Sequence, residues 1–287
     1  MNHQTIPLSP GLYFVATPIG TARDITLRAL DILASADVIA AEDTRSLRRL
    51  LEIHGVKLAG RRVLAYHDHS GAPARARLMA ALAEGKSVAY AAEAGMPLIA
   101  DPGYDLGRAA AEAGHAVTVA PGPSAALAAL TLAGLPTDAF FFAGFLPSAA
   151  GQRKARLAEL RAVPGTLVVY ESPKRAAASL ADMARELGPE RPAALCRELT
   201  KKFEEIRRGS LVDLAQSAAA SPPRGEIVIL VDRAGAGADA PDPDRLDADL
   251  RQALAAHSVR DAADLVAGMH GLPRRQVYQR ALALQKG

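Results

Sequence analysis

The sequence predicts the α/β class: two tandem α/β domains, the first with a parallel sheet and the second with a mixed sheet, followed by a small C-terminal helical domain. Two observations predict it: short apolar strand patterns alternate with helical patterns along most of the chain, and in the first half each strand runs into a tight turn rich in glycine, proline or carboxylates. With 287 residues, 49% of them hydrophobic, the chain is long enough for roughly two domains of about 100–150 residues and an appendage.

The first domain is expected at residues 10–135. Its strand patterns are Leu12–Val15, Val38–Ala41, Val63–Tyr66, Val88–Ala91 and Val117–Ala120. The turns after them are Thr17-Pro18-Ile19-Gly20, Glu42-Asp43-Thr44, His67-Asp68-His69, Ala92-Glu93-Ala94-Gly95-Met96-Pro97 and Pro121-Gly122-Pro123-Ser124. In a parallel sheet these turns share the edge at which ligands bind. Glycine and proline there allow backbone groups to approach a ligand closely, although any α/β protein also needs such residues to reverse its chain.

Helical patterns with conventional ends separate these strands. Thr44 is expected to cap a helix over 45–54 that stops at Gly55, and Ser124 to cap a helix over 125–133 that stops at Gly134.

The second domain is expected at residues 136–233. Its strand patterns are Phe140–Ala143, Thr166–Tyr170, Ala193–Arg197, Phe203–Arg207 and Ile227–Val231, with helices over 152–161, 174–187 and 211–217. The segment 200–209 leaves no room for a helix between its flanking strands, so we expect a hairpin and therefore a mixed sheet.

The end of the chain differs in composition. Residues 234–244 are rich in Ala, Gly, Pro and Asp and are expected to form a linker. A helical basic tail follows at 245–287, with helices over 246–256, 259–268 and 274–284; the last two have the proportions of a helix-turn-helix. The segment from His257 to Gly287 contains five basic and two acidic residues, and this surplus of three positive charges equals the net charge of the whole chain.

Composition excludes several classes. The single Cys196 cannot form an intrachain disulfide, the first eleven residues lack a signal peptide's apolar stretch, and no apolar run approaches the roughly 20 residues that span a bilayer, so a cytoplasmic protein without membrane contact is expected. Neither a Gly-x-Gly-x-x-Gly nor a P-loop motif is present.

Some motifs allow two interpretations. His67-Asp68-His69 contains good metal ligands, but no further ligand is evident, so polar loop or substrate contacts are favoured and no metal is expected. The charged groups of Glu42–Arg45 and Glu171–Arg175 either cap helices or line a substrate cleft. Basic clusters at 153–161 and 201–208 suit phosphates, or are solvated faces.

In this order the motifs resemble the tetrapyrrole methylase superfamily and, within it, the ribosomal RNA small-subunit methyltransferase I family. The matching segments are Ala16–Gly20, Asp24–Thr26, Ala41–Arg45, His67–His69, Gly95–Gly103, Pro121–Ser124, Gly144–Pro147, Tyr170–Ser172, Arg197–Lys201 and Arg224–Glu226. The Glu-Asp-Thr-Arg, His-Asp-His and Arg-Glu-Leu-Thr-Lys elements favour this RNA branch.

The resemblance implies two α/β domains of the tetrapyrrole methylase type, a homodimer, S-adenosyl-L-methionine as cofactor, and methylation of a cytidine ribose 2′-oxygen in 16S rRNA of the small ribosomal subunit. Implied cofactor contacts are Pro18, Gly20, Ala94, Gly95, Met96, Ile99, Ser124, Ala125, Tyr170, Glu171, Leu199 and Glu226. The chain departs from the family at two places. The family usually has Ser-Asp-Ala-Gly-Thr-Pro where this chain has Ala-Glu-Ala-Gly-Met-Pro at 92–97, and Asn where this chain has Thr21. The hydroxyl lost at Met96 removes a possible hydrogen bond, whereas contacts through the main chain would survive.

Methylating a ribose hydroxyl requires alignment and removal of a proton. The hypothesis for the base is Asp43, or Lys201 if burial neutralises its ammonium group. Arg45, His67, Arg274 and Arg275 are expected to contact RNA. A tetrapyrrole methyltransferase acting on a corrinoid precursor, and a non-catalytic RNA- or cofactor-binding protein, remain the alternatives.

Overall fold

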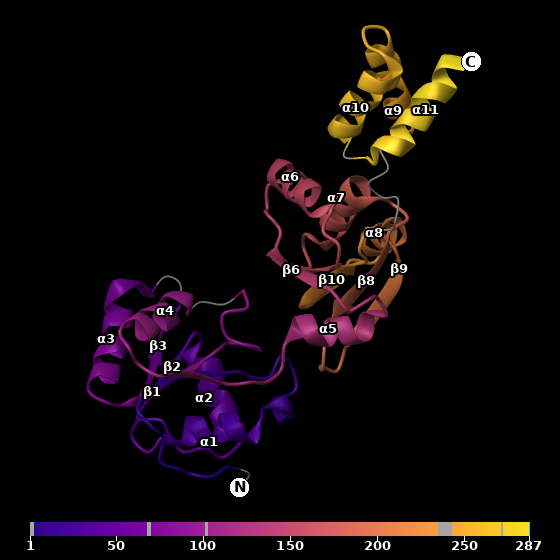
Figure 1. Cartoon of the computed structure of the whole chain (residues 1–287). Coiled ribbons are helices and arrows are strands. Elements are labelled where there is room, and N and C mark those ends of the chain that lie inside the picture. Colours follow the sequence, from indigo (N-terminus) through magenta and orange to yellow (C-terminus); the bar gives the residue numbers. More distant parts are fainter. Residues whose placement is uncertain (1–2, 68–69, 101–102, 235–242, 271, 287) are drawn as a thin grey trace. The chain divides into compact units, whose positions relative to one another are not determined.

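The computed structural model describes residues 3–67, 70–100, 103–234, 243–270 and 272–286. The chain divides into two compact units, Met1–Arg233 and Ala234–Gly287. The first unit holds two five-stranded sheets and the second holds three helices (Figure 1). The domain boundaries at 135 and 244 stay predictions, and most of the expected linker lies outside the described residues.

The first sheet is parallel, as the alternation of strands and helices predicts. Its strand order is β3-β2-β4-β1-β5. In chain order the elements are β1 (Gly11–Val15), η1 (Ala22–Asp24), α1 (Leu27–Ser35), β2 (Val38–Ala41), α2 (Thr44–Ile53), β3 (Val63–Ala65), α3 (Gly71–Ala83), β4 (Ser87–Ala91), α4 (Tyr104–Glu112), β5 (Val117–Ala120) and α5 (Ala125–Ala133).

Alternation along the central strands builds a core on each face of this sheet. Ala89 and Ala91 pack with α1 and α2, whereas Val88 and Tyr90 pack with α3 and α4. Tyr90 is fully buried, and the ring of Phe14 meets it edge-on at a centroid distance of 5.9 Å. A strand buried on both faces reads as a continuous apolar run, which is why these strands are visible in the sequence.

The second sheet is mixed, as expected. Its order is β6-β7-β10-β8-β9, in which only β6 and β7 run parallel. Its elements are β6 (Phe140–Phe145), α6 (Ala150–Leu160), β7 (Thr166–Glu171), α7 (Ala176–Leu187), β8 (Pro192–Arg197), β9 (Glu205–Ser210), α8 (Leu211–Ala220) and β10 (Ile227–Val231). The hairpin is β8 with β9, but β9 begins two residues later than predicted.

The start of β9 is corrected by the turn that precedes it. The Thr200 N–H donates to the Glu204 carboxylate at 2.7 Å, and the Glu204 N–H donates to the Lys201 carbonyl at 3.1 Å. These bonds hold the segment as a turn, and Phe203 is exposed on it instead of pairing in the sheet.

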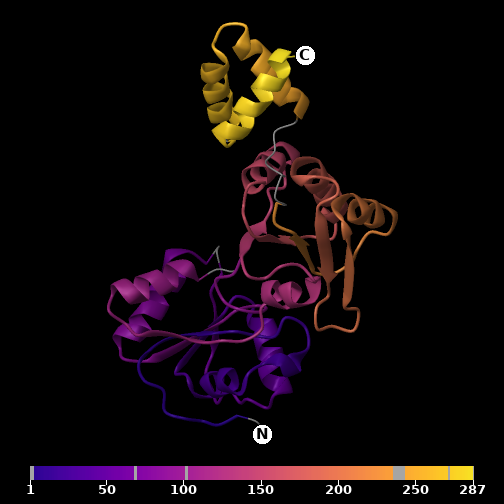
Figure 2. The ribbon, with the colours of Figure 1, turned by 45° about the vertical axis from the view of Figure 1, so that its right-hand side comes forward.

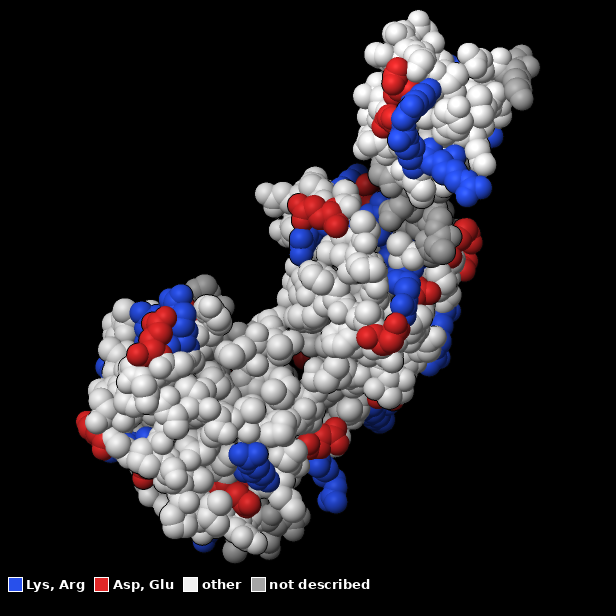
Figure 3. Space-filling view, viewed as in Figure 1, with Lys and Arg blue, Asp and Glu red and all other residues white. Residues whose placement is uncertain are grey.

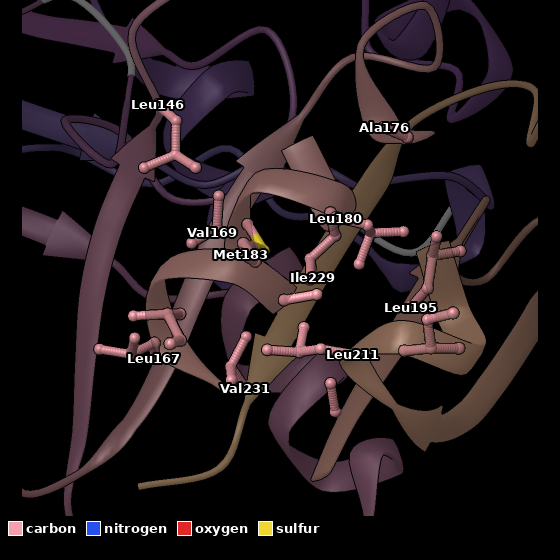
Figure 4. Packing of buried hydrophobic residues seen from close by; sticks show 14 of the residues in the cluster. Leu146, Leu167, Val169, Ala176, Leu180, Met183, Leu195, Leu211, Ile229 and Val231 are labelled. Atoms are coloured by element: carbon pink, nitrogen blue, oxygen red, sulfur yellow. The ribbon is translucent and has the colours of Figure 1, made fainter. Parts of the chain in front are cut away.

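Helices cover both faces of the second sheet (Figures 1 and 2). Leu195 and Ile229 pack with α6, α7 and α8, in the cluster that Figure 4 shows around Leu180 and Met183. The alternate residues Cys196 and Val228 pack with α5 on the opposite face. Helix α5 therefore belongs to the core of the second sheet, although it directly follows the last strand of the first.

The C-terminal unit consists of α9 (Pro243–Leu254), α10 (Val259–His270) and α11 (Arg274–Lys286). Apolar residues of all three helices form its core, among them Leu250, Ala263 and Val277. The Arg280 guanidinium of α11 also donates two hydrogen bonds, of 2.7 and 2.8 Å, to the Asp247 carboxylate of α9.

Two capping expectations meet different outcomes. Asp43, not Thr44, caps α2, because its carboxylate accepts hydrogen bonds from the N–H groups of Arg45 and Ser46. Ser124 does precede α5 in an extended conformation, but its side chain makes no capping bond. Among the described residues no helix is long and apolar enough to cross a membrane.

Candidate functional site

Turns from both sheets of the first unit enclose a hollow of about 430 Å³. Ile19, Ala94 and Ile99 line it from the loops of the first sheet. Tyr170, near the end of β7, and Leu199, in the loop after β8, line it from the second sheet. Its remaining lining residues are Glu93, Ala100, Ala125, Phe145, Glu171, Ser172, Pro173, Gly225, Glu226, Ile227 and Val228. The volume lies within the range of roughly 300–1,000 Å³ typical of small-molecule sites, and the walls are mainly apolar.

The backbone of Gly95 fixes one side of this hollow. Its N–H and C=O pair with the C=O and N–H of Thr17, both at 3.0 Å, and the Thr17 hydroxyl lies 3.2 Å from each of the Ala92 and Glu93 carbonyl oxygens. Because both main-chain groups of Gly95 are already bonded, its role is to hold the loop. The loop is also strained, since Leu98 and Ala100 have φ values of 69° and 59°.

A second close contact joins the turn after β1 to the loop after β8. A Cβ on Gly20 would lie 2.5 Å from Thr200 Oγ1, 2.6 Å from Lys201 Cγ and 2.7 Å from the Leu199 carbonyl oxygen. The Thr21 N–H donates to Thr200 Oγ1 at 3.2 Å across the same junction. Only glycine leaves room for this approach.

Hydrogen bonds to Glu198 and Glu226 hold the loop after β8. The Glu198 N–H donates to the Glu226 carbonyl and the Glu226 N–H donates to the Glu198 carboxylate, both at 2.9 Å. Lys201 Nζ lies 3.0 Å from Glu198 and 2.8 Å from Glu226. Burial lowers the pKa of Lys201, but its hydrogen bonds to Glu226 and Glu198 outweigh this and the net pKa is raised. Burial therefore does not neutralise Lys201, contrary to the condition for its role as a base.

A second hollow of about 590 Å³ opens beside the first. It is lined by Thr17, Pro18, Gly20, Ala22, Asp43, Arg45, Ser46, Leu47, Arg49, Leu50, Ile53, Ala92 and Glu93. Arg45 is 91% exposed at its rim. The N–H groups of Arg45 and Ser46 hold the pKa of the Asp43 carboxyl below its usual value. Glu93 lines both hollows.

Glu171 lines the first hollow, but its carboxylate is fully buried and bonded. It accepts hydrogen bonds from the Ser172 N–H at 2.7 Å, from Arg175 Nε at 2.8 Å and from the Ser179 hydroxyl at 2.5 Å. The side chain holds the turn after β7, so any further contact here falls to the backbone.

The predicted cofactor residues are thus divided by the structure. Seven line the first hollow: Ala94, Ile99, Ala125, Tyr170, Glu171, Leu199 and Glu226. Pro18 and Gly20 line the second hollow, whereas Gly95, Met96 and Ser124 line neither. Nine further residues of the first hollow were missed as site residues: Ile19, Glu93, Ala100, Phe145, Ser172, Pro173, Gly225, Ile227 and Val228. Their place in or beside the matching motifs was the only signal that could have found them.

The predicted RNA residues lie in different parts of the chain. Arg45 lies at the second hollow, while His67 is exposed after β3 and lines neither hollow. Arg274 pairs with Asp264 within the C-terminal unit, and Arg275 is exposed with no partner among the described residues. Asp68 and His69 lie outside the described residues. Within the described part of the chain no cluster of metal-ligating side chains occurs.

Several arginines of the predicted phosphate clusters have structural partners instead. Arg153 is buried and bonds to Asp182 at 2.6 and 2.8 Å. Arg208 bonds to the Leu132 and Ala133 carbonyls at the end of α5. On the face drawn in Figure 3, small groups of basic and acidic side chains are interspersed over the first unit. The idea of broad phosphate-binding clusters at 153–161 and 201–208 is weakened accordingly.

Comparison with known proteins identifies the family. Residues 11–215 match the model of the tetrapyrrole (corrin/porphyrin) methylases, and residues 239–285 match that of the RsmI C-terminal HTH domain. A protein of Mesorhizobium japonicum named ribosomal RNA small subunit methyltransferase I is 52% identical, over 97% of this chain and 94% of its own. The chain belongs to the ribosomal RNA small subunit methyltransferase I family. A relative of that name from Escherichia coli O157:H7 is 41% identical over 99% of both chains.

Solved structures share the fold of this family member at low identity. The cobalamin biosynthetic enzyme cobalt precorrin-4 methyltransferase matches with a TM-score of 0.58 and 19% identity, over 77% of this chain and 94% of its own. A uroporphyrin-III C-methyltransferase from Thermus thermophilus, complexed with S-adenyl homocysteine, matches with a TM-score of 0.53 and 22% identity, over 77% of this chain and 96% of its own. The tetrapyrrole methylase fold and the C-terminal helix-turn-helix expected from the sequence are confirmed.

The junction at Gly20 yields a first prediction. Gly20→Ala places a methyl group against the Leu199 carbonyl, so the loop after β8 has to move and the first hollow widens. We expect a lower melting temperature and at least tenfold weaker binding of S-adenosylmethionine, measured by thermal unfolding and calorimetry. Gly151→Ala is the matched control, because a Cβ there meets nothing within 4 Å. Equal behaviour of the two variants would contradict the prediction.

Proposed function

We propose that the chain transfers a methyl group from S-adenosyl-L-methionine to the ribose 2′-oxygen of a cytidine in 16S rRNA of the small ribosomal subunit. The observation that carries the proposal is 52% identity, over 97% of the chain, to a protein named ribosomal RNA small subunit methyltransferase I. A ribosomal substrate would place the reaction in the cytoplasm.

The first hollow fits the cofactor in size and chemistry. Its apolar wall of Ile99, Leu199 and Val228 suits the flat face of an adenine, and the carboxylate of Glu226 favours the cationic methionyl end. When bound there, S-adenosylmethionine supplies an electrophilic methyl group on a sulfonium. The crystal of the Thermus thermophilus enzyme with S-adenyl homocysteine adds a precedent on the same fold.

The chain's own contribution is alignment. Gly95 and Gly20 hold the turns that frame the two hollows. A nucleotide in the second hollow would therefore be held in a fixed orientation toward the cofactor in the first. Orientation of this kind contributes about 7–11 kcal/mol to many reactions. Arg45, at the rim of the second hollow, suits a backbone phosphate, and the cytidine has to be unstacked to enter.

The two bases suggested by the sequence are weak candidates. Asp43 is held at the N-terminus of α2 with a lowered pKa, and Lys201 is held protonated between two carboxylates. Neither group is free to take a proton from a substrate, because hydrogen bonds already engage both side chains. We therefore assign both residues positioning roles: Asp43 orients α2 and Arg45, and Lys201 fixes the loop after β8.

The activity is tested on small ribosomal subunits that lack the modification. The purified chain with labelled S-adenosylmethionine is expected to transfer one methyl group per subunit, and nuclease mapping should assign it to a cytidine 2′-oxygen. A corrinoid precursor is the competing substrate. Methylation of the corrinoid without methylation of subunits would favour the tetrapyrrole alternative, and transfer to neither would favour a non-catalytic binding protein.

The C-terminal unit is proposed to hold RNA helices near the target through phosphate contacts. Deleting residues 241–287 is expected to weaken subunit binding and flatten its salt dependence while sparing cofactor binding. Arg275→Ala should lower the salt slope by about one unit. Arg274→Ala should have a smaller effect, because this side chain is paired with Asp264. Unchanged RNA affinity in the deletion would make the unit a structural cap.

A homodimer is proposed from the exposed apolar side chains on consecutive edge strands. Val117 and Val119 of β5, and Phe140 and Phe141 of β6, are 37–46% exposed. Both strands lie at an edge of their sheet and therefore present unpaired backbone groups. A second copy of the chain would cover them.

Sedimentation tests this arrangement. The chain is expected to sediment as a dimer, and Phe141→Glu as a monomer, because a carboxylate buried at the interface would be unpaired. Leu265→Glu on α10, at a position 48% exposed, is the matched control and should leave the dimer intact. A monomeric parent chain would contradict the proposal.

A further inference from the structure

Four acidic side chains line the two hollows, and three of them already have partners. Glu171 is buried among three donors, Asp43 caps α2, and Glu226 bonds to Lys201. Glu93 is exposed, and among the described residues no donor bonds to its carboxylate. Its backbone is nevertheless fixed, because the Thr17 hydroxyl lies 3.2 Å from its carbonyl oxygen.

The position of Glu93 is as distinctive as its chemistry. Of the described residues, it alone lines both the hollow of 430 Å³ and the hollow of 590 Å³. A methyl donor in the first hollow and a hydroxyl in the second have to meet at their common wall, so a group on that wall is close to the reacting atoms. The strained backbone at Leu98 and Ala100 belongs to the same loop.

We propose that Glu93 is the catalytic proton acceptor, an inference that rests on the proposed methyl transfer. As the ribose 2′-oxygen forms its bond to the methyl carbon, its proton passes to the Glu93 carboxylate. The electron pair of the breaking C–S bond remains on sulfur, which becomes a neutral thioether. The carboxylic acid then releases its proton to water, so the products are a methyl ether, the thioether and one proton.

The Glu93 carboxylate can take the substrate's proton because no other donor of the described residues occupies it. The charged groups on the two hollows are Asp43, Arg45 and Arg49 on one side and Glu171 and Glu226 on the other. The three acids among them, Asp43, Glu171 and Glu226, are bonded to other donors, so Glu93 remains available to the substrate.

Glu93→Gln tests the inference, because it keeps the shape of the side chain and removes its basicity. We expect kcat on small subunits to fall by about 10²–10⁴-fold, the usual contribution of a general base, with KM changed less than threefold. Calorimetric binding of S-adenosylmethionine, and subunit binding in the presence of S-adenosylhomocysteine, should stay within threefold of the parent chain. Glu93→Asp retains a carboxylate and should recover at least a tenth of the lost rate.

The pH profile distinguishes a base from a merely structural residue. The parent kcat should fall as acid protonates Glu93, whereas the residual rate of Glu93→Gln should lack that limb. Glu112→Gln, an equivalent change on α4 outside both hollows, controls for the loss of charge. Full activity of Glu93→Gln, or a larger loss in Asp43→Asn than in Glu93→Gln, would overturn the inference while leaving methyl transfer intact. A parent chain that methylates no subunit would overturn both.

Discussion

The close approach of two turns at Gly20 is the constraint on which the site depends. The turn after β1 belongs to a parallel sheet, and the loop after β8 belongs to a mixed sheet built from later sequence. They come into contact because residue 20 has no side chain and because the Thr21 N–H donates a hydrogen bond to Thr200 Oγ1. Without this junction Leu199 and Ile19 would not face a common hollow.

The loop after β8 is shaped by its own charges. Glu198 and Thr200 have φ values of 49° and 64°, which few non-glycine residues adopt. The Glu198 carboxylate offsets that strain by accepting from the Glu226 N–H and from Lys201, and Gly225 leaves room for it, since a Cβ there would overlap the carboxylate. The charged residues of this loop, which resemble a phosphate-binding cluster in the sequence, therefore serve mainly to hold the loop that lines the first hollow.

Glutamates on the site illustrate how environment separates identical side chains. Glu171 is fully buried and saturated with donors, so it stabilises a turn. Glu93 is exposed between two hollows with its carboxylate uncommitted among the described residues, so it is available for chemistry. The two glutamates differ in whether hydrogen-bond donors surround the carboxylate, and that depends on how the chain folds around each of them.

The sequence by itself determined the central strands of both sheets. A strand buried on two faces requires a continuous run of apolar residues, and such runs can be recognised whatever lies around them. The motifs likewise determined the family and seven of the residues that line the first hollow. Tertiary structure alone decided that α5 packs on the second sheet, that Arg153 and Arg208 have structural partners, and that Glu93 stands between the hollows. The physical reason is that the partner of a charge, and the open space beside it, depend on contacts between segments that no local pattern records.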